Sequence, residues 1–342
     1  MIKSICSIVK KLSAMALCLT IPLSLCGCES SPTSSDSLTT ITLNEVAHSI
    51  FYAPQYVAIE NGYFADEGIN LKLVTGFGAD KVMTSLVSGD SDIGFMGSES
   101  SVYVYNEGMS DYCVNFAQLT QRAGNFLVSR DKEDDFKWTD LKGKTILGGR
   151  AGGMPQMLLE YVLKKNGMDI DNDVTIIQNI DFGSTAAAFS SGTGDYTVEF
   201  EPSATLLEQQ GQGYVVASLG VDSGYVPYTA YCAKKSYIDS NKGIIQSFTN
   251  AIQKGLDYVN SHSSDEIASI IAPQFTETDL DSIKTIVERY KSQDTWKGDT
   301  IFEESSFDLL TDILKSSGQL DKDIPYTNLV TTSFSEEAKS RK

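Results

Sequence analysis

Short apolar runs alternate along this chain with longer segments in which apolar residues recur every three to four positions. Such alternation predicts βαβ units, mainly parallel strands and therefore an α/β fold. One cycle occupies residues 41–119, and a similar cycle restarts after Gly124 and ends near residue 217. The expected strands are Ile41–Val46, Ile69–Val74, Ile93–Met96, Val114–Leu119, Thr145–Leu147, Val174–Ile177, Tyr196–Val198 and Tyr214–Ala217. The expected helices are Pro54–Tyr63, Asp80–Val87, Ser100–Tyr105, Pro155–Lys165, Ser184–Phe189 and Pro202–Gln209.

Two segments, 88–95 and 191–198, can be laid on each other. Each contains a helix end, a Ser-Gly turn, an aspartate and an apolar strand, and the match places Ser98 opposite Glu201. Two similar α/β halves predict two lobes that face one another. The extended segments 120–129 and 221–235 join the halves and are expected to act as a hinge of two crossing strands.

A helical tail follows the second half, with expected helices at Ile244–Asn260, Ser264–Ile271, Glu277–Tyr290 and Phe307–Ser316. Helices without strands of their own must pack against an existing sheet, most simply the first. We therefore expect lobe 1 to comprise residues 41–122 and 234–325, and lobe 2 to comprise residues 123–233. A hinge between two lobes suits closure around a ligand.

The N-terminus has the pattern of a targeting signal. Three lysines precede an apolar stretch over residues 12–25, which is shorter than the ~20 residues of a membrane span and is typical of a secretory signal. The segment 25–28, Leu-Cys-Gly-Cys, looks like a bacterial lipobox. We expect residues 1–27 to be removed as a lipoprotein signal peptide, Cys28 to carry lipid and residues 28–40 to form a flexible tether. Ordinary secretion with cleavage elsewhere is the alternative.

Charge and cysteine content narrow the possible functions. Lys and Arg total 27 against 45 Asp and Glu, and this net charge of −18 argues against nucleic-acid binding. The chain has only two histidines, which argues against a multi-histidine metal centre. We expect neither a metal nor a cofactor. Once the signal is removed, Cys113 and Cys232 are the cysteines other than Cys28. They could pair, because the compartment permits it, but we favour two buried free thiols.

Several motifs resemble one family. The segments 51–64 (FYAPQYVAIENGYF) and 67–69 (EGI) are similar to periplasmic-type substrate-binding proteins, in the branch that binds aliphatic sulfonates, nitrate, taurine and thiamine pyrimidine precursors. Segments 88–94, 140–144 and 200–202 share the likeness, which extends over roughly residues 40–320. The resemblance implies a type II periplasmic-binding-protein clamshell. It also implies a monomeric, lipid-anchored, extracytoplasmic receptor that delivers a small ligand to an ABC permease and ATPase complex.

The loops that follow the strands are candidate ligand contacts, because ligands of open α/β sheets bind beyond the carboxyl ends of the strands. In lobe 1, Phe51 and Tyr52 either stack on a flat ligand or seal their helix onto the core. His48 is interpreted as a structural hydrogen-bonding group more readily than a catalyst. Glycines allow close approach to a ligand, although a plain turn explains them nearly as well. The candidates in lobe 1 are His48, Phe51, Tyr52, Gly76, Phe77, Gly78, Ser98 and Glu99.

Lobe 2 and the hinge supply the other candidates. The glycine-rich segment 148–155 could bind an anion through Arg150 and backbone N–H groups, or be a flexible turn with a solvated arginine. Glu201 could accept a hydrogen bond from an amine or aminopyrimidine, or cap its own helix. Arg122 could meet a sulfonate or pair with an acid in the hinge. The candidates are Gln121, Arg122, Asn125, Arg150, Gly152, Gly153, Met154, Asn179, Glu201 and Tyr228.

Three functions fit a clamshell of this kind. The favoured one is capture of a small organic ligand, either a thiamine-pyrimidine-like heterocycle or a sulfonate- or nitrate-type anion. A pyrimidine-synthase-like enzyme is the second, but the relevant enzyme relies on a cysteine-rich segment and active-site histidines, and this chain has no cysteine cluster. The third is a ligand-sensing surface lipoprotein, which the sequence hardly separates from an importer receptor.

Overall fold

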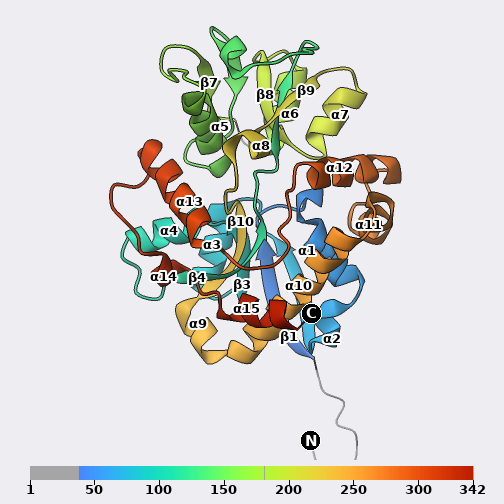
Figure 1. The fold of residues 1–342 in the computed structure, drawn as a ribbon, viewed down its shortest axis with the longest axis vertical. Coiled ribbons are helices and arrows are strands. Elements are labelled where there is room, and N and C mark those ends of the chain that lie inside the picture. The colour runs from blue at the N-terminus through green and yellow to red at the C-terminus, as the bar shows by residue number, and fades with distance from the viewer. Residues whose placement is uncertain (1–37, 181, 342) are drawn as a thin grey trace, which may run out of the picture. The chain divides into compact units, whose positions relative to one another are not determined.

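The computed structural model describes residues 38–180 and 182–341, which form two five-stranded sheets surrounded by helices (Figure 1). The first sheet has the order β2 (Ile69–Thr75), β1 (Thr39–Glu45), β3 (Ile93–Gly97), β10 (Thr229–Lys234) and β4 (Cys113–Thr120). The second sheet has the order β7 (Thr175–Ile177), β6 (Thr145–Leu147), β8 (Tyr196–Phe200), β5 (Asn125–Ser129) and β9 (Tyr214–Ser218). The predicted α/β fold with two similar halves is confirmed.

Each sheet is mixed rather than simply parallel. β1 pairs in parallel with β2 and β3, and β6 pairs in parallel with β7 and β8. β10 runs antiparallel to β3 and β4, and β5 runs antiparallel to β8 and β9. These two antiparallel strands lie in the segments that were expected only to cross between the halves. Because β10 belongs to the first sheet, the prediction that lobe 2 extends to residue 233 is wrong, and the second crossing ends before Thr229.

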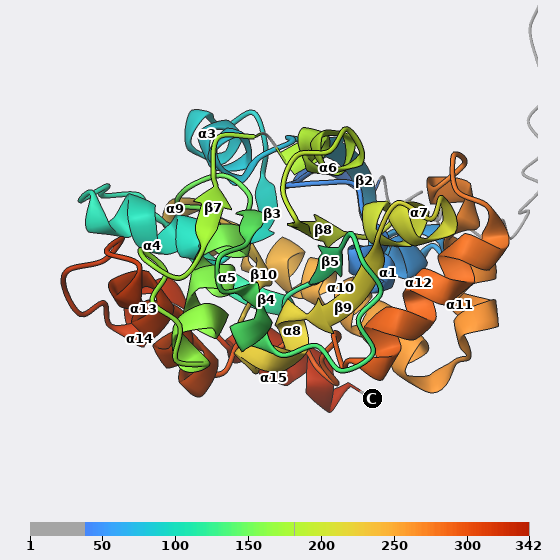
Figure 2. The same cartoon turned by 90° about the horizontal axis from the view of Figure 1, so that it is seen from above.

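Helices cover both sheets. Those packed on the first sheet or on its helices are α1 (Ala53–Glu60), α2 (Tyr63–Asp66), α3 (Ala79–Ser88), α4 (Glu99–Asn106), α9 (Lys235–Ser240), α10 (Lys242–Ser261), α11 (Ser264–Ile271), α12 (Leu280–Ser292), α14 (Tyr326–Leu329) and α15 (Ser333–Ser340). Those on the second are α5 (Met154–Lys165), α6 (Thr185–Ser190), α7 (Ser203–Gln209) and α8 (Leu219–Ser223). α13 (Glu304–Ser316) contacts both α14 and α5. Figure 2 shows α11 and α12 on one flank and α4, α13 and α14 on the opposite flank.

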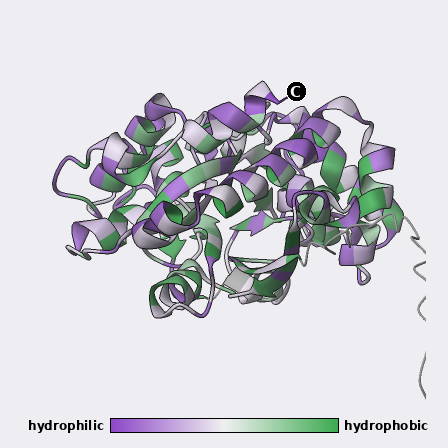
Figure 3. Ribbon diagram, turned by 90° about the horizontal axis from the view of Figure 1, so that it is seen from below, coloured by the Kyte–Doolittle hydropathy of each residue, from purple (hydrophilic) through white to green (hydrophobic). Residues whose placement is uncertain are grey.

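Two glycines explain local features of the first sheet's helices. The predicted helix 54–63 is interrupted because Gly62 adopts φ +72°, a left-handed conformation that favours glycine, and α2 begins immediately after it. Gly255 of α10 lies against α1, where a Cβ atom would come within 2.2 Å of the Pro54 carbonyl oxygen. α10 therefore packs closely on α1. α10 is amphipathic and buries one face in the core, whereas α1 is buried along most of its length. Figure 3 shows hydrophobic and hydrophilic residues interspersed along the helices.

The first sheet's layer extends beyond the predicted end of lobe 1 at residue 325. Ser335 of α15 donates hydrogen bonds to the carbonyl oxygens of Phe116 and Thr300, each at 3.0 Å. The beginning of the layer also differs from the prediction, since residues 39 and 40 belong to β1 and not to a tether. The predicted signal peptide, Cys28 and the rest of the tether to residue 37 lie outside the described residues.

Cys113 and Cys232 are buried free thiols on the neighbouring strands β4 and β10. The Cys113 Sγ lies 3.5 Å from the Met83 Sδ, in a small cluster of apolar side chains between α3 and the first sheet. The structure thus favours the free thiols over a disulfide. Within residues 38–180 and 182–341, no helix combines the length and the apolar character needed to cross a membrane.

Candidate functional site

The loops at the carboxyl ends of the parallel strands of the two sheets contact each other. Ser49, which follows β1, donates from Oγ to the Glu201 carbonyl oxygen after β8, at 3.2 Å. Tyr103 of α4, which follows β3, donates from its hydroxyl to the Gly152 carbonyl oxygen after β6, at 3.3 Å. The expected site between the sheets therefore lies where both sets of loops converge.

A cluster of aromatic rings forms one wall of this region. Phe51, in the 3₁₀ helix Ile50–Tyr52, has its ring centroid 5.8 Å from that of Phe200 and 5.7 Å from that of Tyr228. The Phe200 and Tyr228 centroids are 6.0 Å apart. Phe51 is fully buried and lies against Gly124 in the first crossing, where a Cβ atom would come within 2.5 Å of the ring. Phe51 therefore seals the junction of the sheets, as the alternative interpretation proposed, and Tyr52 packs beside it at 5.2 Å.

Several buried polar atoms beside this wall have no hydrogen-bond partner. They are Glu99 Oε2, the Tyr228 hydroxyl and both polar atoms of the Asn125 side chain, in residues that are 5%, 4% and 0% exposed. An unpartnered buried polar group costs about 1–3 kcal/mol, so proteins retain few of them. Unpartnered atoms also occur in six other described residues, but these three lie beside the aromatic wall and are therefore candidates to complete their hydrogen bonds with a ligand.

Glu99 is the acidic member of this set. It begins α4, and its carboxylate folds back over Gly97, where a Cβ atom would lie 2.2 Å from Oε2. Burial raises the pKa of Glu99 to about 7, and a hydrogen bond from its own backbone N–H opposes that rise. Burial, with the Glu99 charge as a further cause, raises the pKa values of Tyr52, Tyr103 and Tyr228. The Glu99 charge therefore acts on three tyrosine side chains.

His48 has a structural role at the edge of the site. Its Nδ1 lies 2.8 Å from Oε1 of the buried Glu45, and its Nε2 lies 2.8 Å from the Gln274 carbonyl oxygen. The hydrogen bond to Glu45 is the largest cause that raises the pKa of His48. The other Glu45 oxygen accepts hydrogen bonds from Gln55 at 2.7 Å and from Tyr56 at 2.8 Å. Glu45 was not among the predicted residues, although a carboxylate at the end of an apolar strand is a visible signal in the sequence.

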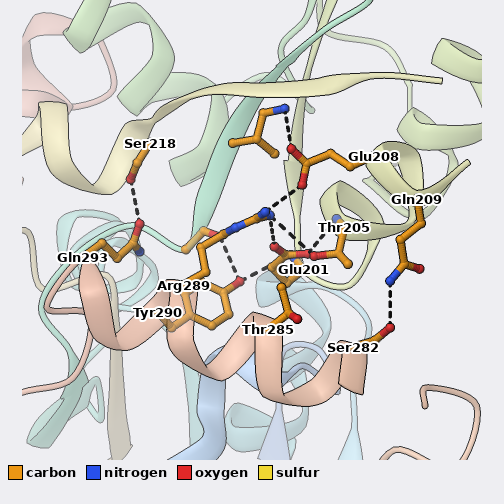
Figure 4. Close-up of polar contacts among 12 residues, drawn as sticks. Glu201, Thr205, Glu208, Gln209, Ser218, Ser282, Thr285, Arg289, Tyr290 and Gln293 are labelled. Carbon is orange, nitrogen blue, oxygen red and sulfur yellow. Dashed lines mark hydrogen bonds and ion pairs between the residues drawn. The ribbon is translucent and has the colours of Figure 1, made fainter. Parts of the chain in front are cut away.

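Glu201 is already engaged within the chain (Figure 4). Arg289 of α12 contacts Glu201 Oε1 and donates to Glu208 Oε2 at 2.6 Å. Glu201 Oε2 accepts from the Thr205 backbone N–H at 2.9 Å, so the helix-capping alternative describes it. Tyr290 fastens the same turn, accepting from the Glu201 N–H at 3.3 Å and donating to the Gly124 carbonyl at 3.0 Å. Arg289 lies 88 residues from Glu201 and was not predicted.

Of the two predicted arginines, Arg122 is partly engaged, with its buried Nε unpartnered, and Arg150 is exposed. Arg122 donates from Nη1 to the Gly220 carbonyl oxygen at 3.0 Å, and its guanidinium lies 4.2 Å from the centroid of the Tyr225 ring. Its observed partners are thus backbone and an aromatic ring, instead of the acid that the sequence suggested. Arg150 is 62% exposed and its Nη2 lies 3.3 Å from Asp80 Oδ1 at the rim.

The remaining candidates fall into three groups. Ser98 donates to the Pro227 carbonyl oxygen, and Gln121 donates to the Asp294 carbonyl oxygen at 3.1 Å, so both hold the crossing segments. Phe77 is 75% exposed and points to solvent, and Asn179 is exposed in the loop after β7. The other positions belong to the turns that begin α3 and α5: Gly76, Gly78, Gly152, Gly153 and the buried Met154.

Two open grooves lie away from these residues. One, of about 300 Å³, lies between β9 and α12 and includes Val215, Val221 and Gln293. The other, of about 470 Å³, lies between α10 and α15. Neither is lined by Glu99 or Tyr228, and their linings contain no unpartnered buried polar atom among the described residues, so we place the candidate site between the sheets.

Comparison with known proteins identifies the family. Residues 50–265 match the family described as "NMT1/THI5 like". The chain belongs to this family. The "Putative binding protein YtlA" of Bacillus subtilis is 48% identical over 307 residues, which cover 90% of this chain and 92% of that protein. The resemblance stated from the sequence motifs is confirmed.

Solved structures show the same fold. The alkanesulfonate-binding protein SsuA from Xanthomonas axonopodis pv. citri, bound to MOPS, has a TM-score of 0.69 at 16% identity and covers 86% of this chain and 98% of that one. The ligand-binding component of an ABC-type import system from Staphylococcus aureus, with zinc bound, has a TM-score of 0.70 at 17% identity and covers 88% and 99%. The architecture is the type II periplasmic-binding-protein fold.

Proposed function

We propose that this protein captures a small organic ligand between its two sheets and presents it to an ABC importer. One observation carries the proposal: loops at the carboxyl ends of both sheets meet around buried polar atoms that lack partners, notably Glu99 Oε2 and the Tyr228 hydroxyl. Relatives named for ligand binding and ABC-type import support it.

Capture follows from the two-part construction. Helices that follow strands of the first sheet supply Tyr52 and Glu99, the second sheet supplies Asn125 and Phe200, and the second crossing supplies Tyr228. A ligand that touches all of them has more contacts when the two halves are closed, so it shifts a hinge equilibrium toward the closed form. The lobe boundaries predicted from the sequence are part of this proposal, with β10 assigned to lobe 1 instead of lobe 2.

The partners and the location are proposals that follow from the same family. The expected partners are an ABC permease and its ATPase, and the expected location is outside the cytoplasm, with the monomeric chain anchored by lipid on Cys28. The ligand classes that the sequence suggested are a thiamine-pyrimidine-like heterocycle, which would stack on the aromatic wall, and a sulfonate- or nitrate-type anion.

A pyrimidine-synthase-like enzyme and a surface sensor are the alternatives. His48 is bonded through both ring nitrogens to Glu45 and Gln274, which favours a structural role over proton transfer to a ligand. A binding protein returns its ligand unchanged, whereas an enzyme does not. A sensor and an importer receptor differ only in whether a permease and ATPase are required for uptake.

The test is a thermal-shift screen of residues 29–342 against pyrimidines, flavins, sulfonates and nitrate. A ligand present at 100 times its dissociation constant adds ~2.7 kcal/mol to the free energy of unfolding. The variant Tyr228→Phe should bind the ligand more weakly, because it loses only the unpartnered hydroxyl. Tyr225→Phe, in the same crossing but 49% exposed, is the matched control. Mass spectrometry of the released ligand should show no chemical change, and conversion would support the enzyme instead.

A further inference from the structure

We infer that Glu99 sets the charge of the ligand: the site accepts an uncharged or cationic molecule that offers N–H donors to this carboxylate, and it rejects oxoanions such as sulfonate and nitrate. The inference rests on the proposed function and chooses between ligand classes that the sequence left open.

The first step is the state of the Glu99 carboxylate. Its Oε2 is buried without a partner, and its own backbone N–H supplies one hydrogen bond to the group. Within the described residues, no lysine or arginine forms an ion pair with Glu99, although other buried acids such as Glu201 are paired. A buried acceptor without a donor or a cation favours a ligand that brings one.

The second step is that, in the part of the chain that the structure describes, no hydrogen bond or ion pair joins Glu99 to Arg122, Arg150 or Arg289. Arg122 donates to the Gly220 carbonyl and lies against the Tyr225 ring, with its buried Nε unpartnered, and Arg150 is exposed beside Asp80. Arg289, the half-buried arginine of α12, already contacts two carboxylates, Glu201 and Glu208. An oxoanion placed beside Glu99 would therefore meet a carboxyl in a weakly screened environment without an arginine paired to that carboxyl.

The third step is that the site is fixed in position before any ligand arrives. Ser98 donates to the Pro227 carbonyl oxygen, and these residues immediately precede Glu99 and Tyr228. This hydrogen bond therefore fixes the backbone positions of Glu99 and Tyr228 relative to each other. Tyr52 packs edge-on against Phe95 at 4.5 Å, which fixes a further aromatic ring near the same carboxyl. A flat or cationic ligand gains from such rings without needing a counter-anion.

The experiment compares matched probes on the full mature chain by isothermal titration calorimetry. The probes are 4-aminopyrimidine and benzamidine as N–H donors, the second a cation, and methanesulfonate and nitrate as oxoanions. We expect at least one donor probe to bind and both oxoanions to fail. Glu99→Gln should weaken the donor probe by about 10- to 100-fold, the range for a hydrogen bond to a charged group, and should weaken a cation more than a neutral donor.

Glu199→Gln is the matched control. Glu199 is also buried, but its carboxyl accepts from Thr197 at 2.7 Å on the face of the second sheet that α6 covers, so the change should leave probe affinity unaltered. Tight binding of an oxoanion by the unaltered protein, or equal donor affinity in Glu99→Gln, would overturn this inference and leave the proposed function standing. Failure of every probe and of the wider screen would overturn both.

Discussion

Replacing Glu99 by glutamine should stabilise the ligand-free protein at neutral and alkaline pH. Burial raises the pKa of Glu99 from its ordinary 4.5 to about 7, so the folded protein holds this proton more tightly than the unfolded chain does. The free energy of unfolding therefore falls as pH rises from about 4.5 through 7 and levels off above. At 1.36 kcal/mol per pKa unit, the penalty at pH 8 is about 3 kcal/mol.

Glutamine has nearly the same shape and carries no charge, so it avoids that penalty. We expect urea denaturation at pH 8 to give Glu99→Gln a free energy of unfolding up to about 3 kcal/mol above that of the unaltered protein. The difference should shrink to near zero at pH 4, where Glu99 is protonated in both states. Glu107→Gln, an exposed glutamate at the end of the same helix, is the control and should show no such change.

If Glu99→Gln both stabilises the protein and weakens ligand binding, then Glu99 serves the function of the protein and destabilises its fold. The reasoning would be refuted by a Glu99→Gln protein that is no more stable than the unaltered one at pH 8. A gain in stability that stays constant between pH 4 and pH 8 would equally contradict it, because the effect would then not come from ionisation.

Three further perturbations test other parts of the structure. His48→Gln should destabilise the protein more at pH 5 than at pH 9. The pKa of His48 is raised in the folded state, so the stabilisation that protonated His48 provides is lost as pH rises through that pKa. Urea denaturation curves at both pH values measure the difference. Arg289→Met should lower the free energy of unfolding by about 3 kcal/mol or more, since it strands the carboxylate of Glu201, and an unchanged urea midpoint would oppose that assignment. Phe51→Ala should cost about 3–5 kcal/mol in the same assay, whereas Arg150→Ala, at an exposed ion pair, should cost under about 1 kcal/mol.

The sequence predicted those elements whose periodicity is local. The strands of the parallel ladders and helices such as α5 and α10 appear close to their expected bounds. β5 and β10 were expected only as extended connections, because their pairing is with strands distant in the sequence: Asn125 pairs with Phe200, and Tyr231 pairs with Phe95. α15 lies beyond the expected end of lobe 1, and its tie to the first sheet is likewise made at long range.

The positions of the candidate residues could be predicted from the sequence better than their contacts. The loop after the third strand gave Ser98 and Glu99 as candidates, the second crossing gave Tyr228, and Ser98 is bonded to the residue before Tyr228. For Glu201, Arg122 and Arg150 the sequence left a ligand contact and a structural or solvated role both open, because partners such as Arg289, Gly220 and Asp80 come from distant segments. In the sequence, Arg289 looks like an ordinary surface residue of a helix. Only the tertiary structure shows that it pairs with Glu201.

The most direct measurement is a crystal structure of residues 29–342 with the tightest-binding probe. Our account predicts density for the ligand between the two sheets, with a nitrogen within hydrogen-bond distance of Glu99 Oε2 and of the Tyr228 hydroxyl. A ligand seated in the groove between β9 and α12, or one between the sheets that leaves both of those atoms unpartnered, would contradict it.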